Sequence, residues 1–115
     1  MGLDVSHNAW SGPYSSFNRW RCALALAAGF NLDTMQGFDG DRSWESVPQR
    51  PLNELLHHSD CDGEIEWELC GPIADDLELI LAQLPFDNDN LRAKTRRFIA
   101  GLRDAYAQHE TLEFG

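Results

Sequence analysis

The side chains best suited to do chemistry are concentrated in one stretch, residues 57–68. It contains two histidines, five acidic residues and one cysteine, in the order His57-His58-Ser59-Asp60-Cys61-Asp62-Gly63-Glu64-Ile65-Glu66-Trp67-Glu68. Carboxylates are the ligands that calcium prefers, and imidazole or thiolate groups suit zinc. We therefore expect this acidic stretch to be the main candidate for a binding site.

With Gly63 at its turn, the stretch resembles the calcium loop of an EF-hand. Asp60, Asp62 and Glu64 fall at ligand positions, and Ile65 follows as the apolar residue of the pattern. The resemblance implies a divalent-cation-binding helix-loop-helix module with calcium as its cofactor. The two ends depart from the pattern, because histidine and Leu69 stand where acids are expected, although Glu68 lies only one residue early. The candidate metal ligands are His58, Asp60, Asp62, Glu64 and Glu68.

The same acids also alternate strictly with other residues from Asp60 to Glu68, which is the period of a β-strand. On that interpretation the carboxylates point outward in a row and contact a basic protein partner through Glu64, Glu66 and Glu68. A plain structural interpretation is equally open, in which the turn binds no metal and the cysteines fill space in the core. A zinc site is less expected, because the chain has no Cys-x-x-Cys pair.

A second group of polar and aromatic side chains lies near the N-terminus. It could form a small-ligand pocket that stacks a ring and pairs an anion with Arg19 or Arg21, or it could be an arm that packs on the core. Its candidate ligand-binding residues are His7, Trp10, Tyr14, Arg19 and Trp20. The sequence contains no nucleophile elbow, P-loop or dinucleotide fingerprint. We therefore expect a binding protein rather than an enzyme, and we nominate no catalytic residue.

Composition limits the partners. The 115 residues indicate a single domain over 1–115, and nineteen acids against nine basic residues give a net charge of -10. Such a field repels nucleic acid and anionic membranes and attracts basic protein surfaces. The longest apolar run is too short to span a membrane. The odd number of cysteines, three, suggests reduced thiols in a cytoplasmic compartment.

Apolar periodicity predicts a mostly α fold whose helices must position these groups. We expect helices over about 16–28 and 90–108, a short one after Pro51, and one that opens at Pro72 and ends before Pro85. Residues 10–13 are predicted to turn, and 30–50 to form an ordered loop held by Phe38, Trp44 and Val47. A small β pair could join Leu3-Asp4-Val5 to Leu112 and Phe114. The basic face of the last helix could serve a homodimer.

The whole chain resembles small uncharacterised proteins of bacteria and their phages. The similarity rests on the Gly2–His7 segment, the Trp10–Trp20 aromatic run, the His-Ser-Asp-Cys-Asp-Gly-Glu loop and the Leu112-Glu113-Phe114 ending. It implies a cytoplasmic setting, the host cytoplasm for a phage protein. The leading hypothesis is a non-catalytic acidic binding or regulatory protein, in a phage an inhibitor of a host protein. The alternatives are the calcium-binding module and a small ligand-sequestering protein or enzyme that uses the N-terminal pocket.

Overall fold

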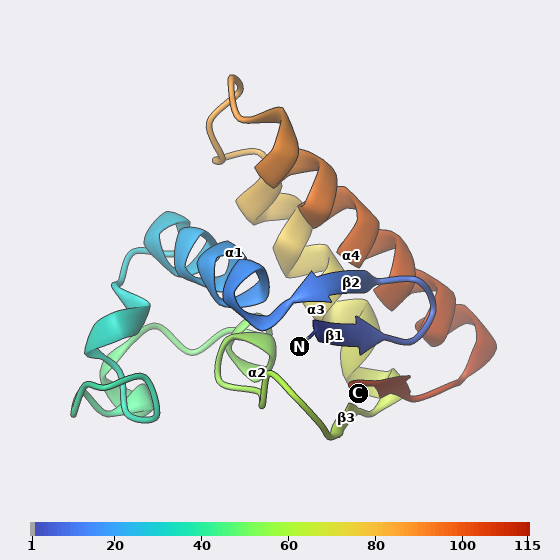
Figure 1. Cartoon of the computed structure of the whole chain (residues 1–115), viewed down its shortest axis with the longest axis horizontal. Coiled ribbons are helices and arrows are strands. Elements are labelled where there is room, and N and C mark those ends of the chain that lie inside the picture. The colour runs from blue at the N-terminus through green and yellow to red at the C-terminus, as the bar shows by residue number, and fades with distance from the viewer. Residues whose placement is uncertain (1) are drawn as a thin grey trace.

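The computed structural model describes residues 2–115, and in that range the chain forms four α-helices and two pairs of short antiparallel strands (Figure 1). The predicted mostly α class with a small β component is therefore confirmed. The helices are α1 (Tyr14–Ala27), α2 (Asn53–Leu56), α3 (Trp67–Leu81) and α4 (Asp89–Gln108). The strands are β1 (Gly2–Val5), β2 (Trp10–Pro13), β3 (Glu64–Ile65) and β4 (Leu112–Glu113).

The two long helices, α3 and α4, lie antiparallel and side by side (Figure 1). Arg103 of α4 pairs with Asp75 and Glu78 of α3, at 3.0 and 2.9 Å. Nearer the start of α3, Gly71 has no side chain where the Tyr106 ring of α4 passes, and an added Cβ would lie 2.8 Å from that ring. Each helix buries one apolar stripe, as the periodicity predicted, and fully buried members are Ile73, Leu77, Ile80, Phe98, Leu102 and Ala105.

The start of α3 differs from the prediction. Pro72 lies inside the helix instead of opening it, because the helix begins at Trp67. The preceding turn is held by packing, since Cys70 and Gly71 are buried. That burial offsets the one backbone hydrogen bond which proline cannot donate.

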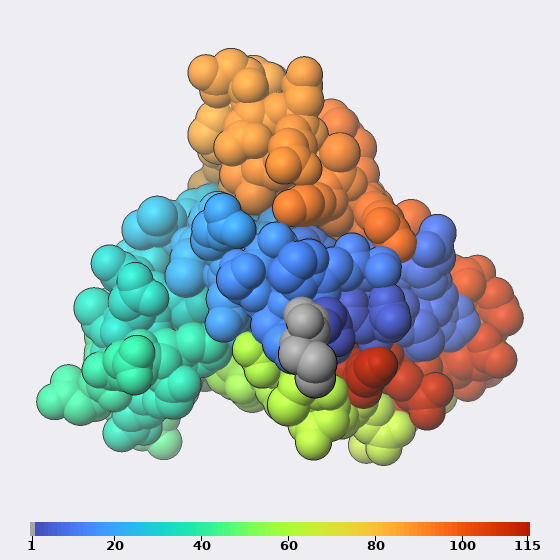
Figure 2. All heavy atoms as spheres, viewed as in Figure 1, coloured from blue at the N-terminus to red at the C-terminus, as the bar shows by residue number. Residues whose placement is uncertain are grey.

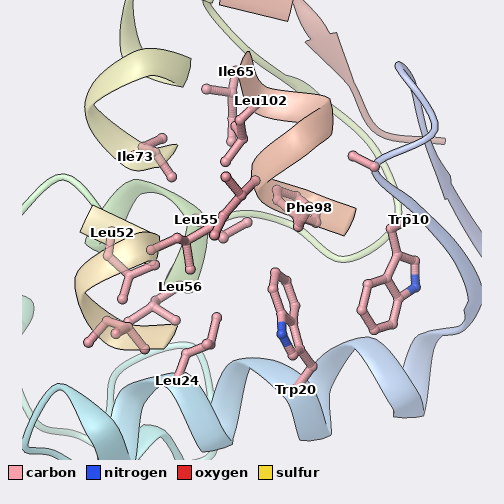
Figure 3. Packing of buried hydrophobic residues seen from close by; sticks show 14 of the residues in the cluster. Trp10, Trp20, Leu24, Leu52, Leu55, Leu56, Ile65, Ile73, Phe98 and Leu102 are labelled. Atoms are coloured by element: carbon pink, nitrogen blue, oxygen red, sulfur yellow. The ribbon is translucent and has the colours of Figure 1, made fainter. Parts of the chain in front are cut away.

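Aromatic side chains join α1 to the helix pair. Trp10, Phe17, Trp20 and Phe98 form a chain of ring contacts, with Trp20 and Phe98 centroids 4.9 Å apart. Figure 3 shows Trp10, Trp20 and Phe98 in the core. The indole Nε1 of Trp20 donates to Thr95 Oγ1 of α4 at 2.9 Å, which satisfies a polar group in the core. Helix α1 begins two residues earlier than predicted, after the extended Pro13, and no side chain caps it.

The short strands form a ribbon in the order β2, β1, β4, β3. β1 pairs with β2 and β3 with β4, while a single bridge between Val5 and Phe114 joins the two pairs. The predicted contact between the two ends of the chain is thus present, but only as this bridge. The predicted turn at 10–13 was wrong, because those residues are β2. The turn is instead at residues 6–9, where His7 and Asn8 adopt positive φ.

The segment between α1 and α2 is an ordered loop, as predicted, with two short 3-10 turns, η1 (Leu32–Thr34) and η2 (Trp44–Ser46). Val47 is buried, and Phe38 and Trp44 pack partly against the core. α2 follows Pro51 and buries Leu55 and Leu56. Its position is fixed by Asp76 of α3, which accepts hydrogen bonds from Arg50 and from the Leu52 N–H.

Candidate functional site

The acidic stretch is a loop fastened at both ends. The Arg21 guanidinium donates to the carbonyls of Leu55, Leu56 and His58, where α2 ends. At the other end the Gly63 carbonyl accepts from the Phe114 N–H at 2.9 Å. Gly63 takes a φ of 93°, which an L side chain rarely adopts. Residues 60–62 form a bend, and Gly63 leads directly into β3.

His58 is a structural element of this loop. Its Nδ1 lies 2.9 Å from the Ser59 carbonyl oxygen and its Nε2 lies 3.1 Å from that of Glu64. The imidazole stacks on Phe114 with ring centroids 4.1 Å apart. Because both ring nitrogens face backbone carbonyls, neither presents a lone pair to a metal ion.

The predicted metal ligands do not converge. Asp60 is half-buried and lies near Asn18, whose amide is 3.5 Å from its carboxylate. Asp62 and Glu64 are exposed, and Glu68 lies in the first turn of α3. Within residues 2–115 no three His, Cys, Asp or Glu side chains are grouped so that they could hold a metal ion. The calcium hypothesis thus has no support from the geometry.

The strand interpretation is realised only at Glu64 and Ile65, because the chain enters α3 at Trp67. Glu64 stands directly opposite Glu113 of β4, and both are exposed. Asp4 lies beyond, on the neighbouring strand, where its carbonyl accepts from the Gly115 N–H. Alternation along the ribbon puts these three carboxylates on its solvent side. We call Asp4, Glu64 and Glu113 the acidic face.

The acidic face borders a shallow hollow of about 540 Å³ that the C-terminal residues line. Figure 2 shows those residues at the surface beside the first strand and the yellow-green segment that carries the loop. Glu66 and Glu68 continue the exposed acids from the ribbon into the start of α3. The three predicted partner-binding residues, Glu64, Glu66 and Glu68, are therefore all accessible.

The basic side chains are engaged elsewhere. Arg50 pairs with Asp76, Arg103 pairs with Asp75 and Glu78, and His7 contacts Asp104 and Glu110. Arg97 binds the hairpin turn through Asn8. Across the described part of the chain, no ion pair reaches the acidic face or the acids from 60 to 68. Apart from the half-buried Asp60, these carboxylates consequently face solvent without a cation of their own.

The predicted N-terminal ligand pocket is not assembled. Trp10 and Trp20 are 4% and 2% exposed, because they belong to the aromatic core. His7 turns away to Asp104, with Nδ1 2.7 Å from the carboxylate oxygen, while Tyr14 is half-buried. Only Arg19 and Trp20 share a hollow, of about 370 Å³, between α1 and the start of α4. The group is thus mainly an arm packed on the core.

The chain was compared with known proteins in three ways. No family model, curated protein or solved structure matches it. The fold and the geometry of the side chains therefore carry the functional argument alone. In addition, no helix within residues 2–115 has the length and apolar character that crossing a membrane requires.

Arg21 was predicted only as an alternative to Arg19 for pairing an anion in the N-terminal group, and the structure places it at a different hollow, which Arg19 does not line. It is 1% exposed and lies at the edge of a hollow of about 530 Å³. Its position gave a signal, because it follows Phe17 by four residues and so lies on the apolar face of α1. A charge on such a face needs a specific environment.

Proposed function

We propose that this protein is a non-catalytic binding or regulatory protein whose acidic surface docks on a basic surface of a protein partner. The observation that supports it best is the Glu64–Glu113 pair, two like charges directly opposite each other without a cation. Like charges directly opposite each other destabilise a pair of strands. A cationic partner surface would relieve that repulsion on binding.

The charge distribution favours a protein partner. The net charge of -10 opposes contact with phosphate backbones, whereas it accelerates association with a basic protein. The acids that carry this field are the unpaired ones on the ribbon and at the start of α3. In the phage setting that the sequence resemblance implies, the partner is a host protein and the chain is its inhibitor.

A second copy of the chain is an alternative partner, because its α4 carries exposed basic residues. α4 exposes Arg96, and Arg97 and Arg103 are also at its surface. Arg103 is already paired within the chain, however, so this face offers less free positive charge than the sequence suggested. Sedimentation at low and high salt distinguishes a homodimer from a complex with a different protein.

The test is capture of a partner from bacterial lysate with the wild-type chain and with Glu64, Glu66 and Glu68 changed to lysine. We expect the triple variant to lose the captured protein, and wild-type capture to weaken with added salt because exposed charges are screened. The matched control changes Asp41, Glu45 and Asp87 to lysine, which alters the net charge equally at exposed sites elsewhere.

Circular dichroism must show that both variants are folded, because a lysine at 68 opposes the dipole of α3 and costs about 0.3–1 kcal/mol. Equal capture by the wild type and by the folded triple variant would remove the acidic surface as the binding site. Equal loss in the triple variant and the control would show that total charge matters and location does not.

A further inference from the structure

A hollow of about 530 Å³ lies between α1, the loop that carries η2, and the beginning of the acidic stretch. Its wall combines polar, aromatic and charged side chains. They include Asn18, Arg21, Phe38, Trp44, His57 and Asp60. This site is separate from the acidic face, which is on the strand ribbon.

The guanidinium of Arg21 is held in place on several sides. Its Cζ lies 4.6 Å from the Phe17 ring centroid and 5.2 Å from that of Phe38. Nη1 donates to the three carbonyls at the end of α2, and Nη2 donates to Asn18 Oδ1 at 2.6 Å. The group is therefore rigid before any ligand arrives, which lowers the entropy cost of binding.

The charge of Arg21 has no carboxylate partner. Within the described residues it forms no ion pair, and its Nε has no hydrogen-bond acceptor. Burial lowers the pKa of Arg21 to about 10 while the charge of Asp60 opposes that shift, so the guanidinium stays charged at neutral pH. Nε and Nη2 share one edge of the guanidinium, where Nε is buried without an acceptor and Nη2 gives one of its two hydrogens to Asn18. That edge matches the two oxygens of a carboxylate.

The aromatic wall indicates what the carboxylate is attached to. The Trp44 ring lies edge-to-face with His57 at 5.3 Å and with Phe38 at 6.2 Å. His57 is exposed and Trp44 half-buried, so both offer ring surface to a ligand. A flat ring fits beside such side chains, since aromatic pairs attract in stacked and edge-to-face arrangements.

We propose that this hollow binds a small aromatic carboxylate, whose carboxylate pairs with Arg21 and whose ring packs on Trp44 and His57. The ligand carries a single charge, because Asp60 lines the same wall and the protein is strongly acidic. In the free protein the negative charge of Asp60 stabilises the charged Arg21 from a distance, although the two form no ion pair. The same charge repels the carboxylate of the ligand. The proposal is independent of the acidic face, and either can fail alone.

The test uses benzoate, its neutral analogue benzamide, and phenyl phosphate on the full chain, with calorimetry and thermal melts at millimolar concentration. We expect benzoate to raise the melting temperature and to give a saturable heat, and benzamide to do neither. Absence of both effects with benzoate, or equal effects from benzamide, overturns the proposal. Binding of phenyl phosphate alone overturns the assignment to a carboxylate.

Two variants locate the site without removing Arg21, whose loss would release the end of α2. His57→Glu places a carboxylate beside the ligand and should raise the Kd of benzoate roughly tenfold or more. Its control, Gln83→Glu, adds the same charge at an exposed site after α3 and should leave the Kd unchanged. Asp60→Asn removes the competing charge and should lower the Kd about fivefold. Unchanged affinity in both His57→Glu and Asp60→Asn would show that benzoate binds elsewhere and would overturn the proposal.

Discussion

Replacing Asp76 by alanine should lower the free energy of unfolding by about 3 kcal/mol, the lower end of the range for breaking a buried charge pair. The Asp76 side chain is 7% exposed and accepts from Arg50 Nε and Nη2 and from the Leu52 N–H. Truncation leaves that N–H and a guanidinium without an acceptor. We choose the lower end because Arg50 is 24% exposed and can regain water.

Urea unfolding and thermal melts measure the effect, and about 3 kcal/mol corresponds to a fall of roughly 10 °C in melting temperature for a domain of this size. Asp75→Ala is the matched control. Asp75 precedes Asp76 on the same helix and pairs with Arg103, but it is exposed and its loss should cost at most about 1 kcal/mol. A cost below about 1 kcal/mol for Asp76→Ala would refute the view that this carboxylate anchors α2.

The contribution of Asp76 should also depend on pH. Burial raises the pKa of the Asp76 carboxyl, but the hydrogen bonds and charge of Arg50 and the Leu52 N–H outweigh burial, so the pKa lies below its ordinary value. A group whose pKa is lowered by folding stabilises the native state above its unfolded pKa, about 3.9, and loses that contribution as the pH falls through the folded pKa. The stability difference between wild type and Asp76→Asn should therefore be constant above about pH 5 and shrink below about pH 4. A difference that is independent of pH down to the acid transition would contradict the ion pair.

Two further predictions concern packing and thiol reactivity. Gly101→Ala should destabilise the fold by about 1–3 kcal/mol despite its better helix propensity, because the new Cβ would lie 2.4 Å from the Cβ of Ala9; a urea titration showing equal or higher stability would contradict that close approach. A thiol reagent at neutral pH should label Cys61 rapidly, Cys22 more slowly and Cys70 only after unfolding, because Cys61 is exposed, Cys22 is half-buried with a raised pKa, and burial raises the pKa of the Cys70 thiol to about 11. Mass spectrometry of briefly labelled native protein checks this, and early modification of Cys70 would be incompatible with its burial.

The helices could be predicted from sequence because their signals are local. The apolar spacing of Ile73, Leu77 and Ile80 in α3, and of Phe98 and Leu102 in α4, is set by the 3.6-residue period and survives any tertiary arrangement. The beginning of α3 could not be placed, because Pro72 is a local stop signal that tertiary packing of the preceding turn overrides. The hairpin of β1 and β2 was missed for a related reason. Its turn uses His7 and Asn8 at positive φ, which histidine rarely adopts, and α4 holds that turn through Arg97 and Asp104.

The conformation of the acidic loop could not be predicted from sequence patterns alone. The alternation of acids fits a strand, and the spacing around Gly63 fits a calcium loop except at its two ends. The outcome depended on Phe114 and Arg21, which contact the loop from distant parts of the chain. Phe114 stacks on the His58 ring, and Arg21 donates hydrogen bonds to the carbonyls at the end of α2. With the loop held in this way, the acids from 62 to 68 are exposed. The role of Arg21 at this end of α2 was likewise hidden, since its hydrogen bonds to distant carbonyls and its lack of an ion pair are properties of the folded chain.

The bridge between β1 and β4 governs when the acidic face can exist. Ser6 and Glu113 are hydrogen-bonded although they are 107 positions apart. Closing so long a loop is entropically costly, and contacts of such separation slow folding relative to local helical ones. During synthesis, residues 112–114 are made after β1 and β3. Only then can β4 pair with β3, which brings Glu64 opposite Glu113, and bridge to β1, which brings Asp4 beside them. The acidic face therefore forms only once residues 112–114 have joined the ribbon, and a chain that contains α1, α3 and α4 but stops before residue 112 would lack it.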